Sequence, residues 1–151
     1  MKVSSPIFEN NGSIPAEYTC DGEGRNPLLL VTDAPENAKG LVLIVDDPDA
    51  PMGIFTHWVV WNIPADIEEI SEETLASLAK VGKNSAGEVG WIAPCPPNGI
   101  HHYRFQVFAL SQLLNIPEGS DRDTVEREME KSVIDRAELV GEYQRRTEEP
   151  A

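Results

Sequence analysis

Apolar residues along the chain gather in short runs, and four segments predict β-strands: Leu28–Val31, Leu41–Val45, His57–Ile63 and Tyr103–Leu110. The run Leu41–Val45 is apolar at every position, follows Gly40 and ends at an Asp-Asp-Pro turn. A short run without polar alternation is typical of a strand that is buried on both faces. We therefore expect Leu41–Val45 to lie at the centre of a sheet.

The two later strands carry polar side chains whose orientation should follow the two-residue period of a strand. In His57–Ile63 this period predicts that His57 shares a face with Val59, Trp61 and Ile63. In Tyr103–Leu110 the odd positions share a face, and His101 joins them if the strand begins that early.

A short helix is predicted after Ser71. Ser71 is a favourable N-cap residue, and Glu72 and Glu73 place acidic side chains in the first turn. Lys80 and Gly82 are typical of a helix C-terminus, so the segment is expected to end there.

A longer helix is predicted from about Asp121 to Val140. Ser120 is the expected N-cap, and Asp123, three residues on, resembles a capping box. Apolar residues at i, i+4 spacing form one stripe that should contact the core: Val125, Met129, Val133 and Ala137. Gly141 is expected to end this helix.

Composition favours a single domain that spans residues 1–151. Twelve prolines and eleven glycines indicate a turn-rich β fold rather than a helical bundle. The chain has 26 acidic and 12 basic residues, which gives a formal net charge of -14. Such a charge disfavours binding to nucleic acid or to an anionic membrane, so any anion site has to be local.

The N-terminal residues and the cysteines bear on the cellular compartment. The first six residues turn polar almost at once, unlike a signal peptide, and no apolar run approaches the ~20 residues of a membrane span. We therefore expect a cytoplasmic protein in which Cys20 and Cys95 are reduced thiols. A disulfide between them is the alternative, and a catalytic Cys95 paired with a histidine is a third, which the flanking prolines disfavour.

Candidate chemistry is concentrated in segments 46–58 and 93–103, which contain all three histidines. In the first segment Asp47 and Asp49 flank Pro48 just after a buried strand, and Pro48 keeps Asp47 extended. Taken alone, these carboxylates are explained equally well as turn residues that accept backbone N–H bonds. His57, taken alone, is explained as a hydrogen-bonded strand histidine.

The second segment adds hydrogen-bond donors. In Pro94-Cys95-Pro96-Pro97 the prolines have no N–H, so the Cys95 N–H is a rigidly held donor. His101 and Tyr103 follow on alternate positions of a strand. Two imidazoles, a phenol and an amide suit a phosphate or carboxylate group. Asp47 would orient one imidazole or receive an ammonium group of the ligand.

Two motifs together resemble one protein family: Asp-Pro-Asp-Ala-Pro followed by His-Trp, and Pro-Cys-Pro-Pro-x-Gly-x-His-x-Tyr. The chain is similar to the phosphatidylethanolamine-binding protein (PEBP) family, most closely its bacterial and archaeal YbhB/YbcL, or Raf kinase inhibitor-like, branch. The resemblance extends from the segment 18–22 to Gly141-x-Tyr143-x-Arg145. It implies a mainly β fold, a PEBP-like antiparallel β-sandwich with Greek-key connections and one or two flanking α-helices. It also implies a small surface pocket for phosphate-like anions.

Carried over residue by residue, the ligand-binding positions of the family are Asp47, Ala50, Pro51, His57, Cys95, Pro96, Pro97, His101 and Tyr103. The resemblance also implies a cis bond between Ala50 and Pro51, and Asp49 as a buried partner that stiffens the first motif. Two positions depart from the family pattern. Ala93 replaces a glycine and is expected to narrow the pocket or shift its loop, and His102 replaces an arginine and is expected at the surface. The long C-terminal element that closes the pocket in eukaryotic members has no clear equivalent, so a lipid is not the expected ligand.

The favoured function is a binding module that takes a phosphate- or carboxylate-bearing small ligand or protein side chain. It would need no cofactor and would regulate a protein kinase or serine protease by docking to it. The alternative is a hydrolase in which Asp47, His57 and His101 supply acid–base groups. A divalent metal site on the same three residues is a third hypothesis, although their spacing matches no metal motif. Exposed strand edges of a sandwich are compatible with a homodimer.

Overall fold

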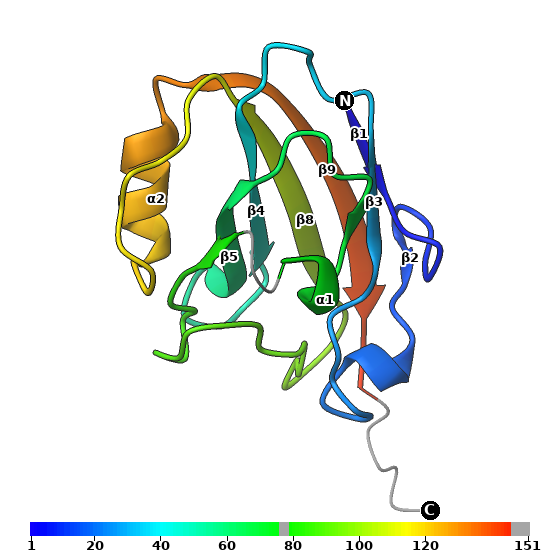
Figure 1. The fold of residues 1–151 in the computed structure, drawn as a ribbon. Coiled ribbons are helices and arrows are strands. Elements are labelled where there is room, and N and C mark those ends of the chain that lie inside the picture. The colour runs from blue at the N-terminus through cyan, green and yellow to red at the C-terminus, as the bar shows by residue number, and fades with distance from the viewer. Residues whose placement is uncertain (76–78, 146–151) are drawn as a thin grey trace, which may run out of the picture.

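The computed structural model describes residues 1–75 and 79–145 and is built around two β-sheets (Figure 1). The larger sheet has six strands in the order β2-β9-β8-β4-β5-β7. They are β2 (Gly12–Ser13), β4 (Gly40–Asp47), β5 (Phe55–Ile63), β7 (Lys80–Val81), β8 (His101–Leu110) and β9 (Val133–Tyr143). The smaller sheet has the order β1-β3-β6, formed by β1 (Lys2–Ser4), β3 (Leu29–Thr32) and β6 (Glu69–Ile70). The predicted mainly β class is confirmed.

Within the described residues three short helices accompany the sheets: the 3-10 helix η1 (Ala16–Tyr18), and the α-helices α1 (Glu72–Leu75) and α2 (Arg122–Met129). Strands that pair within each sheet run antiparallel, apart from β2, which lies parallel to β9. Among the described residues, no helix combines the length and apolar character that crossing a bilayer requires.

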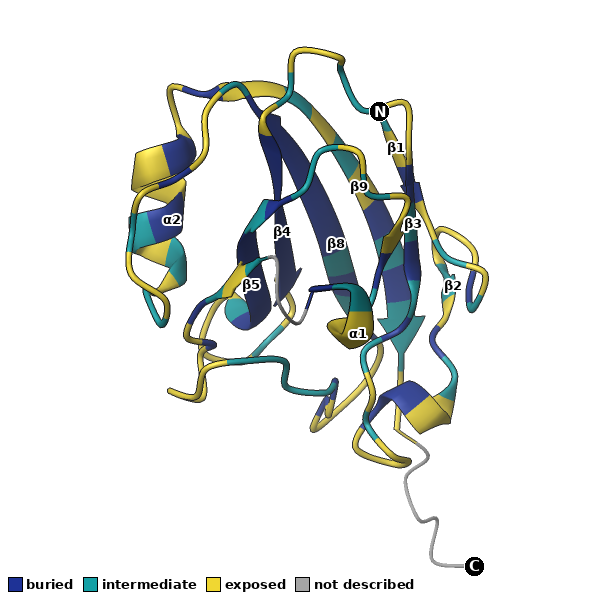
Figure 2. Ribbon diagram, in the orientation of Figure 1, coloured by how far each residue is buried: buried dark blue, intermediate teal, exposed yellow. Residues whose placement is uncertain are grey.

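Strand β4 occupies the centre of the larger sheet, between β5 and β8, and all eight of its residues are buried (Figure 2). This confirms the prediction for Leu41–Val45 and extends the strand to Asp47. The strands expected from the other apolar segments are also present, and β8 begins at His101. The first predicted strand lies one residue further along, at Leu29–Thr32.

Apolar side chains cover both faces of the larger sheet. Leu43 and Val45 of β4 belong to the main core, together with Leu29 of the smaller sheet. Ile44 points to the opposite face and belongs to a second cluster with Val125 of α2. The larger sheet is therefore a middle layer, with the smaller sheet on one side and α2 on the other (Figure 1).

The predicted helix from Asp121 to Val140 is wrong over most of its length. Helix α2 ends at Met129, and residues 133–143 form β9, which pairs with β8 over almost its entire length. Within this strand Arg136, Ala137 and Glu138 favour helix locally, but the open edge of β8 offers the segment a ladder of backbone hydrogen bonds. Of the predicted stripe, Val125 and Met129 lie on α2, whereas Val133 and Ala137 lie on β9.

The predicted caps of this helix are also wrong. Asp121, not Ser120, is the N-cap of α2, because its carboxylate accepts the N–H of Thr124 at 2.9 Å. The Ser120 hydroxyl instead donates to the Pro117 carbonyl at 2.6 Å. Because Ser120 is not the N-cap, the capping-box role of Asp123 also fails. Gly141 ends no helix and lies within β9.

The predicted first helix begins where expected. The Thr74 N–H donates to the Ser71 hydroxyl at 3.3 Å, and α1 follows from Glu72. Residues 76–78 of the predicted helix lie outside the described residues. The predicted C-terminus at Lys80 and Gly82 is wrong, because Lys80 pairs with Trp61 as part of β7.

Candidate ligand-binding pocket

A small cavity opens where β4 leaves the larger sheet and β5 and β8 enter it. Its free volume is about 170 Å³. Its lining comprises Asp47, Ala50, Pro51, Phe55, His57, Ile92, Ala93, Cys95, Pro96, Pro97, His101 and Tyr103. All nine residues predicted to bind the ligand are in this set, so the fold brings the two motifs together. Phe55 and Ile92 were not among the predicted positions, whereas Ala93 was expected beside the pocket but not as a ligand-binding residue.

A β-bulge gives His57 its position. Along β4 and β5 the register changes between Val45, opposite Trp58, and Asp46, opposite Thr56. The extra residue on β5 is His57, whose ring contacts the Tyr103 ring edge-on at a centroid distance of 5.3 Å. Bulges reorient a side chain in this way. The predicted two-residue period is therefore wrong here, because Val59 and Trp61 face the second cluster beside α2.

Asp47 and His101 form a buried pair across β4 and β8. The Nδ1 atom of His101 lies 2.5 Å from Oδ2 of Asp47, and both side chains are at most 7% exposed. The other carboxylate oxygen of Asp47 accepts the Asp49 N–H at 2.8 Å. A carboxylate accepts only, so Nδ1 of His101 carries the proton and Nε2 remains for a ligand.

His57 is held as a neutral base. Its Nδ1 donates to the Ile92 carbonyl at 2.7 Å, which requires the proton on Nδ1 and leaves a lone pair on Nε2. Burial lowers the pKa of His57 below its usual value, against the opposing effects of the Ile92 carbonyl and of Asp47. The imidazole of His57, predicted from the sequence to be a donor, therefore presents an acceptor to the cavity.

The Tyr103 hydroxyl is buried without a hydrogen-bond partner among the described residues. Tyr103 is fully buried in β8, and burial, reinforced by the charge of Asp47, raises the pKa of its phenol. The hydroxyl therefore keeps its proton and has no acceptor within the described part of the chain. Such a buried, unsatisfied O–H is destabilising by about 1–3 kcal/mol.

A disulfide between Cys20 and Cys95 supports the wall of the cavity. The expectation of two reduced thiols is wrong, as is a catalytic Cys95, because neither sulfur is free. The bond joins the loop after η1 to the proline-rich loop, 75 residues further along the chain. The Cys20 N–H also donates to the Pro94 carbonyl at 3.0 Å. The sequence offered no pairing geometry, so it could not choose between thiols and disulfide.

Further contacts fix the same wall. The Trp91 indole N–H donates to the Gly24 carbonyl at 2.8 Å. A Cβ placed on Gly24 would lie 3.2 Å from the Cβ of Ala93, so these two residues are close-packed. Ala93 lines the cavity beside this contact, and the cavity remains open. The Cys95 N–H donates to no acceptor within residues 1–75 and 79–145.

The first motif departs from expectation at two points. No cis peptide occurs in the described part of the chain, so the Ala50–Pro51 bond is trans and the expected cis bond is wrong. Asp49 is not buried: its carboxylate is 40% exposed and accepts both the His102 N–H and the His102 ring. Asp49 still links the first motif to the start of β8. His102 is partly exposed, as expected.

The geometry does not favour the metal hypothesis. No group of three His, Cys, Asp or Glu side chains converges as a metal site among the described residues. Asp47 is engaged by His101, and the Nδ1 atom of His57 is bound to a carbonyl.

The two packed sheets, with a small cavity at the strand ends, define a class of small β-sandwich proteins. The sequence profile described as phosphatidylethanolamine-binding protein matches residues 4–144, and the chain belongs to this family. Among curated relatives, a UPF0098 protein of Pyrococcus abyssi is 47% identical over 97% of this chain and 86% of its own length. A UPF0098 protein of Aquifex aeolicus is 45% identical over 96% of this chain and 89% of its own length.

Solved structures agree with this assignment. A PEBP homologue from Chlamydia trachomatis superposes with a TM-score of 0.91 at 37% identity, covering 96% of this chain and 97% of its own. Escherichia coli YbcL, described as a member of the mammalian PEBP family, superposes with a TM-score of 0.88 at 28% identity. That match covers 96% of this chain and 98% of YbcL.

Proposed function

We propose that the cavity binds a phosphate-like or carboxylate group, and that the protein works as a binding module rather than an enzyme. The unpartnered hydroxyl of Tyr103 carries this proposal. It lies on a residue of the cavity lining and keeps its proton. An anion in the cavity would accept from it and remove the cost of the buried, unsatisfied donor.

The other polar groups of the lining complement such a ligand. The Cys95 N–H is a second donor, whereas the neutral His57 presents an acceptor. A monoprotonated phosphoryl group has charged oxygens that accept hydrogen bonds and also one P–O–H that donates. It can therefore pair with the Tyr103 hydroxyl and the Cys95 N–H and, at the same time, with His57. Asp47 keeps the ring of His101 in place. The lining is small and largely apolar otherwise, which fits one such group and not a long chain.

The narrower form of the proposal is docking to a partner protein. A phosphorylated or acidic side chain of a protein kinase or protease would enter the cavity, and the surrounding loops would contact its neighbours. The net charge of -14 does not attract acidic partners at long range, so recognition would rest on the local contacts.

Hydrolysis is the competing function, because the Asp47–His101 pair resembles an acid–base unit. The described lining has no serine or threonine, and the sulfur of Cys95 is in the disulfide, so an activated water would be the nucleophile. Release of phosphate from p-nitrophenyl phosphate, lost in a His101→Ala variant, would establish this alternative.

The test is an NMR titration with inorganic phosphate and with O-phosphoethanolamine. Saturable amide shifts at Cys95, His57 and Tyr103 are expected. Tyr103→Phe should weaken phosphate binding about tenfold, the loss of one hydrogen bond to a charged group. The same substitution should stabilise the ligand-free protein by about 1 kcal/mol, measured by urea unfolding, because it removes an unsatisfied buried hydroxyl.

Tyr143→Phe is the matched control. Tyr143 lies on the neighbouring strand outside the cavity, and its hydroxyl donates to Asp21. This variant should keep the phosphate affinity of the wild type and lose some stability. If Tyr103→Phe binds phosphate as tightly as wild type, the anion site is not in this cavity.

A further inference from the structure

A buried ionic network lies on the reverse face of the sheet, directly behind the cavity. The Asp46 carboxylate is fully buried. It accepts from Nε and Nη2 of Arg104 at 2.6 and 2.8 Å, and from Nη1 of Arg122 at 2.6 Å. Gln106 adds a fourth bond at 3.2 Å. None of these residues had a role predicted from the sequence.

On each of the three strands, the network residue is adjacent in sequence to a residue that lines the cavity. Asp46 precedes Asp47 on β4, Thr56 precedes His57 on β5, and Arg104 follows Tyr103 on β8. Successive residues of a strand point to opposite faces. A contact that holds Asp46, Thr56 and Arg104 in register therefore also fixes the side chains on the cavity face.

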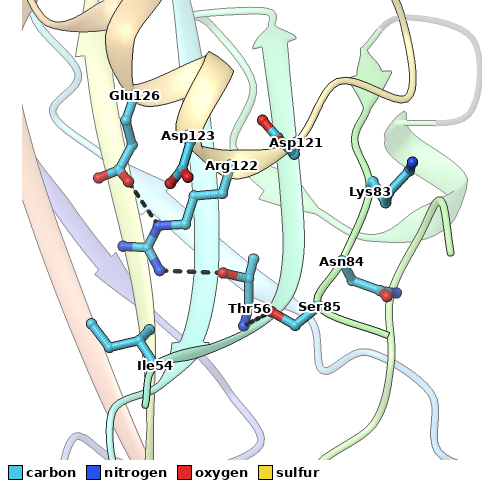
Figure 3. A pocket seen from close by; sticks show the side chains of 9 residues that line it. All are labelled: Ile54, Thr56, Lys83, Asn84, Ser85, Asp121, Arg122, Asp123 and Glu126. Carbon is cyan, nitrogen blue, oxygen red and sulfur yellow. Dashed lines mark hydrogen bonds and ion pairs between the residues drawn. The ribbon is translucent and has the colours of Figure 1, made fainter. Parts of the chain in front are cut away.

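Arg122 joins the network to α2. It is the first residue of this helix, and its guanidinium reaches both Asp46 and, at 3.3 Å, the Thr56 hydroxyl. Its Nε is bound to Glu126 at 3.0 Å. Figure 3 shows the guanidinium between Glu126 and Thr56, in an open pocket on this face. The side chain is 17% exposed, so it is accessible yet largely buried.

We propose that Arg122 is a positioning residue for the anion pocket, acting through Asp46 and Thr56. By fixing the strand ends at the bulge in β5, it sets the geometry of the Asp47–His101 pair and of His57. This inference rests on the proposed function for its ligand. Its structural part, the effect on His101, does not depend on any ligand.

The main variant is Arg122→Gln. Asp46 keeps Arg104 and Gln106 as partners, so the carboxylate stays paired and the domain is expected to fold. In the ligand-free protein, the imidazole ¹H–¹⁵N resonances of His101 should shift, and the proton shared with Asp47 should move upfield as that bond lengthens. The affinity for inorganic phosphate should fall about fivefold. Arg122→Lys keeps the positive charge, so it should change the His101 resonances and the phosphate affinity less than Arg122→Gln does.

Arg127→Gln is the matched control. Arg127 lies on the same helix, is exposed, and among the described residues forms a hydrogen bond only with Thr124. It should leave the His101 resonances and the phosphate affinity unchanged. Both substitutions remove one positive charge. A difference between the two variants in the His101 resonances or the phosphate affinity therefore reports on the contacts of Arg122 and not on net charge.

The outcomes are separable. Unchanged His101 resonances in Arg122→Gln, or a lower stability alone, would overturn the positioning role. If this variant fails to fold, Thr56→Val, which removes only the Thr56 contact of Arg122, decides by the same two measurements. Wild-type protein that binds no phosphate would instead defeat the proposed function, whereas shifts at His101 would still support the coupling.

Discussion

The neutral imidazole of His57 couples protonation to folding. Burial lowers its pKa in the folded protein. In the unfolded chain a histidine titrates near its usual pKa of about 6.5. Below that pH the unfolded chain binds a proton that the folded chain does not. Stability contributed by neutral His57 is therefore present above about pH 6.5 and is lost as pH falls below it.

His57→Asn tests this linkage, because an asparagine amide can replace the Nδ1–H bond to the Ile92 carbonyl. Urea unfolding between pH 5 and 7.5 should show a smaller loss of stability at acidic pH in the variant than in the wild type. The difference between the two proteins is the relevant quantity, because carboxylates contribute equally to both. Parallel profiles would contradict a depressed pKa at His57.

At the residue scale, the composition of the pocket could be predicted and its protonation could not. All nine positions predicted from the two motifs line the cavity. The motifs did not show that Ile92 would fix the tautomer of His57, because this contact joins residues 35 positions apart. They also missed Asp46, whose partners Arg104 and Arg122 come from two other elements.

The strand β9 shows how far pattern reasoning extends at the element scale. Val125, Met129, Val133 and Ala137 have helical spacing, yet the chain changes from helix to strand within this series. A helix and a strand both accept apolar residues at these positions, so local periodicity does not separate them. Pairing of β9 with β8 decides the outcome, and that information lies outside the segment. The β-bulge at His57 escaped prediction for the same reason.

Gly141→Ala tests the packing of β9 against the core. In the strand, a Cβ at Gly141 would lie 2.6–2.8 Å from side-chain atoms of Ile14 and Phe8, so the variant should be destabilised by about 1–3 kcal/mol. The free energy of unfolding from urea titrations is the measurement, and a gain in stability would contradict β9.

On the scale of the whole molecule, one covalent bond joins loops from distant parts of the sequence. Reduction of the Cys20–Cys95 disulfide by a dithiol should lower the free energy of unfolding by about 2–4 kcal/mol. The proline-rich wall should become more mobile, and phosphate should bind less tightly. Thermal unfolding and amide exchange with and without reductant measure the two effects.

The Cys20→Ala/Cys95→Ala double variant provides the control for this prediction. It should resemble the reduced protein and should not respond to reductant. A wild-type protein whose stability and phosphate affinity are the same in both redox states would show that the hydrogen bonds of Cys20 and Trp91 hold the wall by themselves.

The strand order also determines when the larger sheet can be completed during synthesis on the ribosome. β9 lies between β8 and β2, although it is made after both. Until residues 133–143 emerge, β8 has one edge without a partner and β2 has no strand in this sheet to pair with. A nascent chain arrested before that point would present a bare strand edge, the surface that chaperones protect and that promotes aggregation.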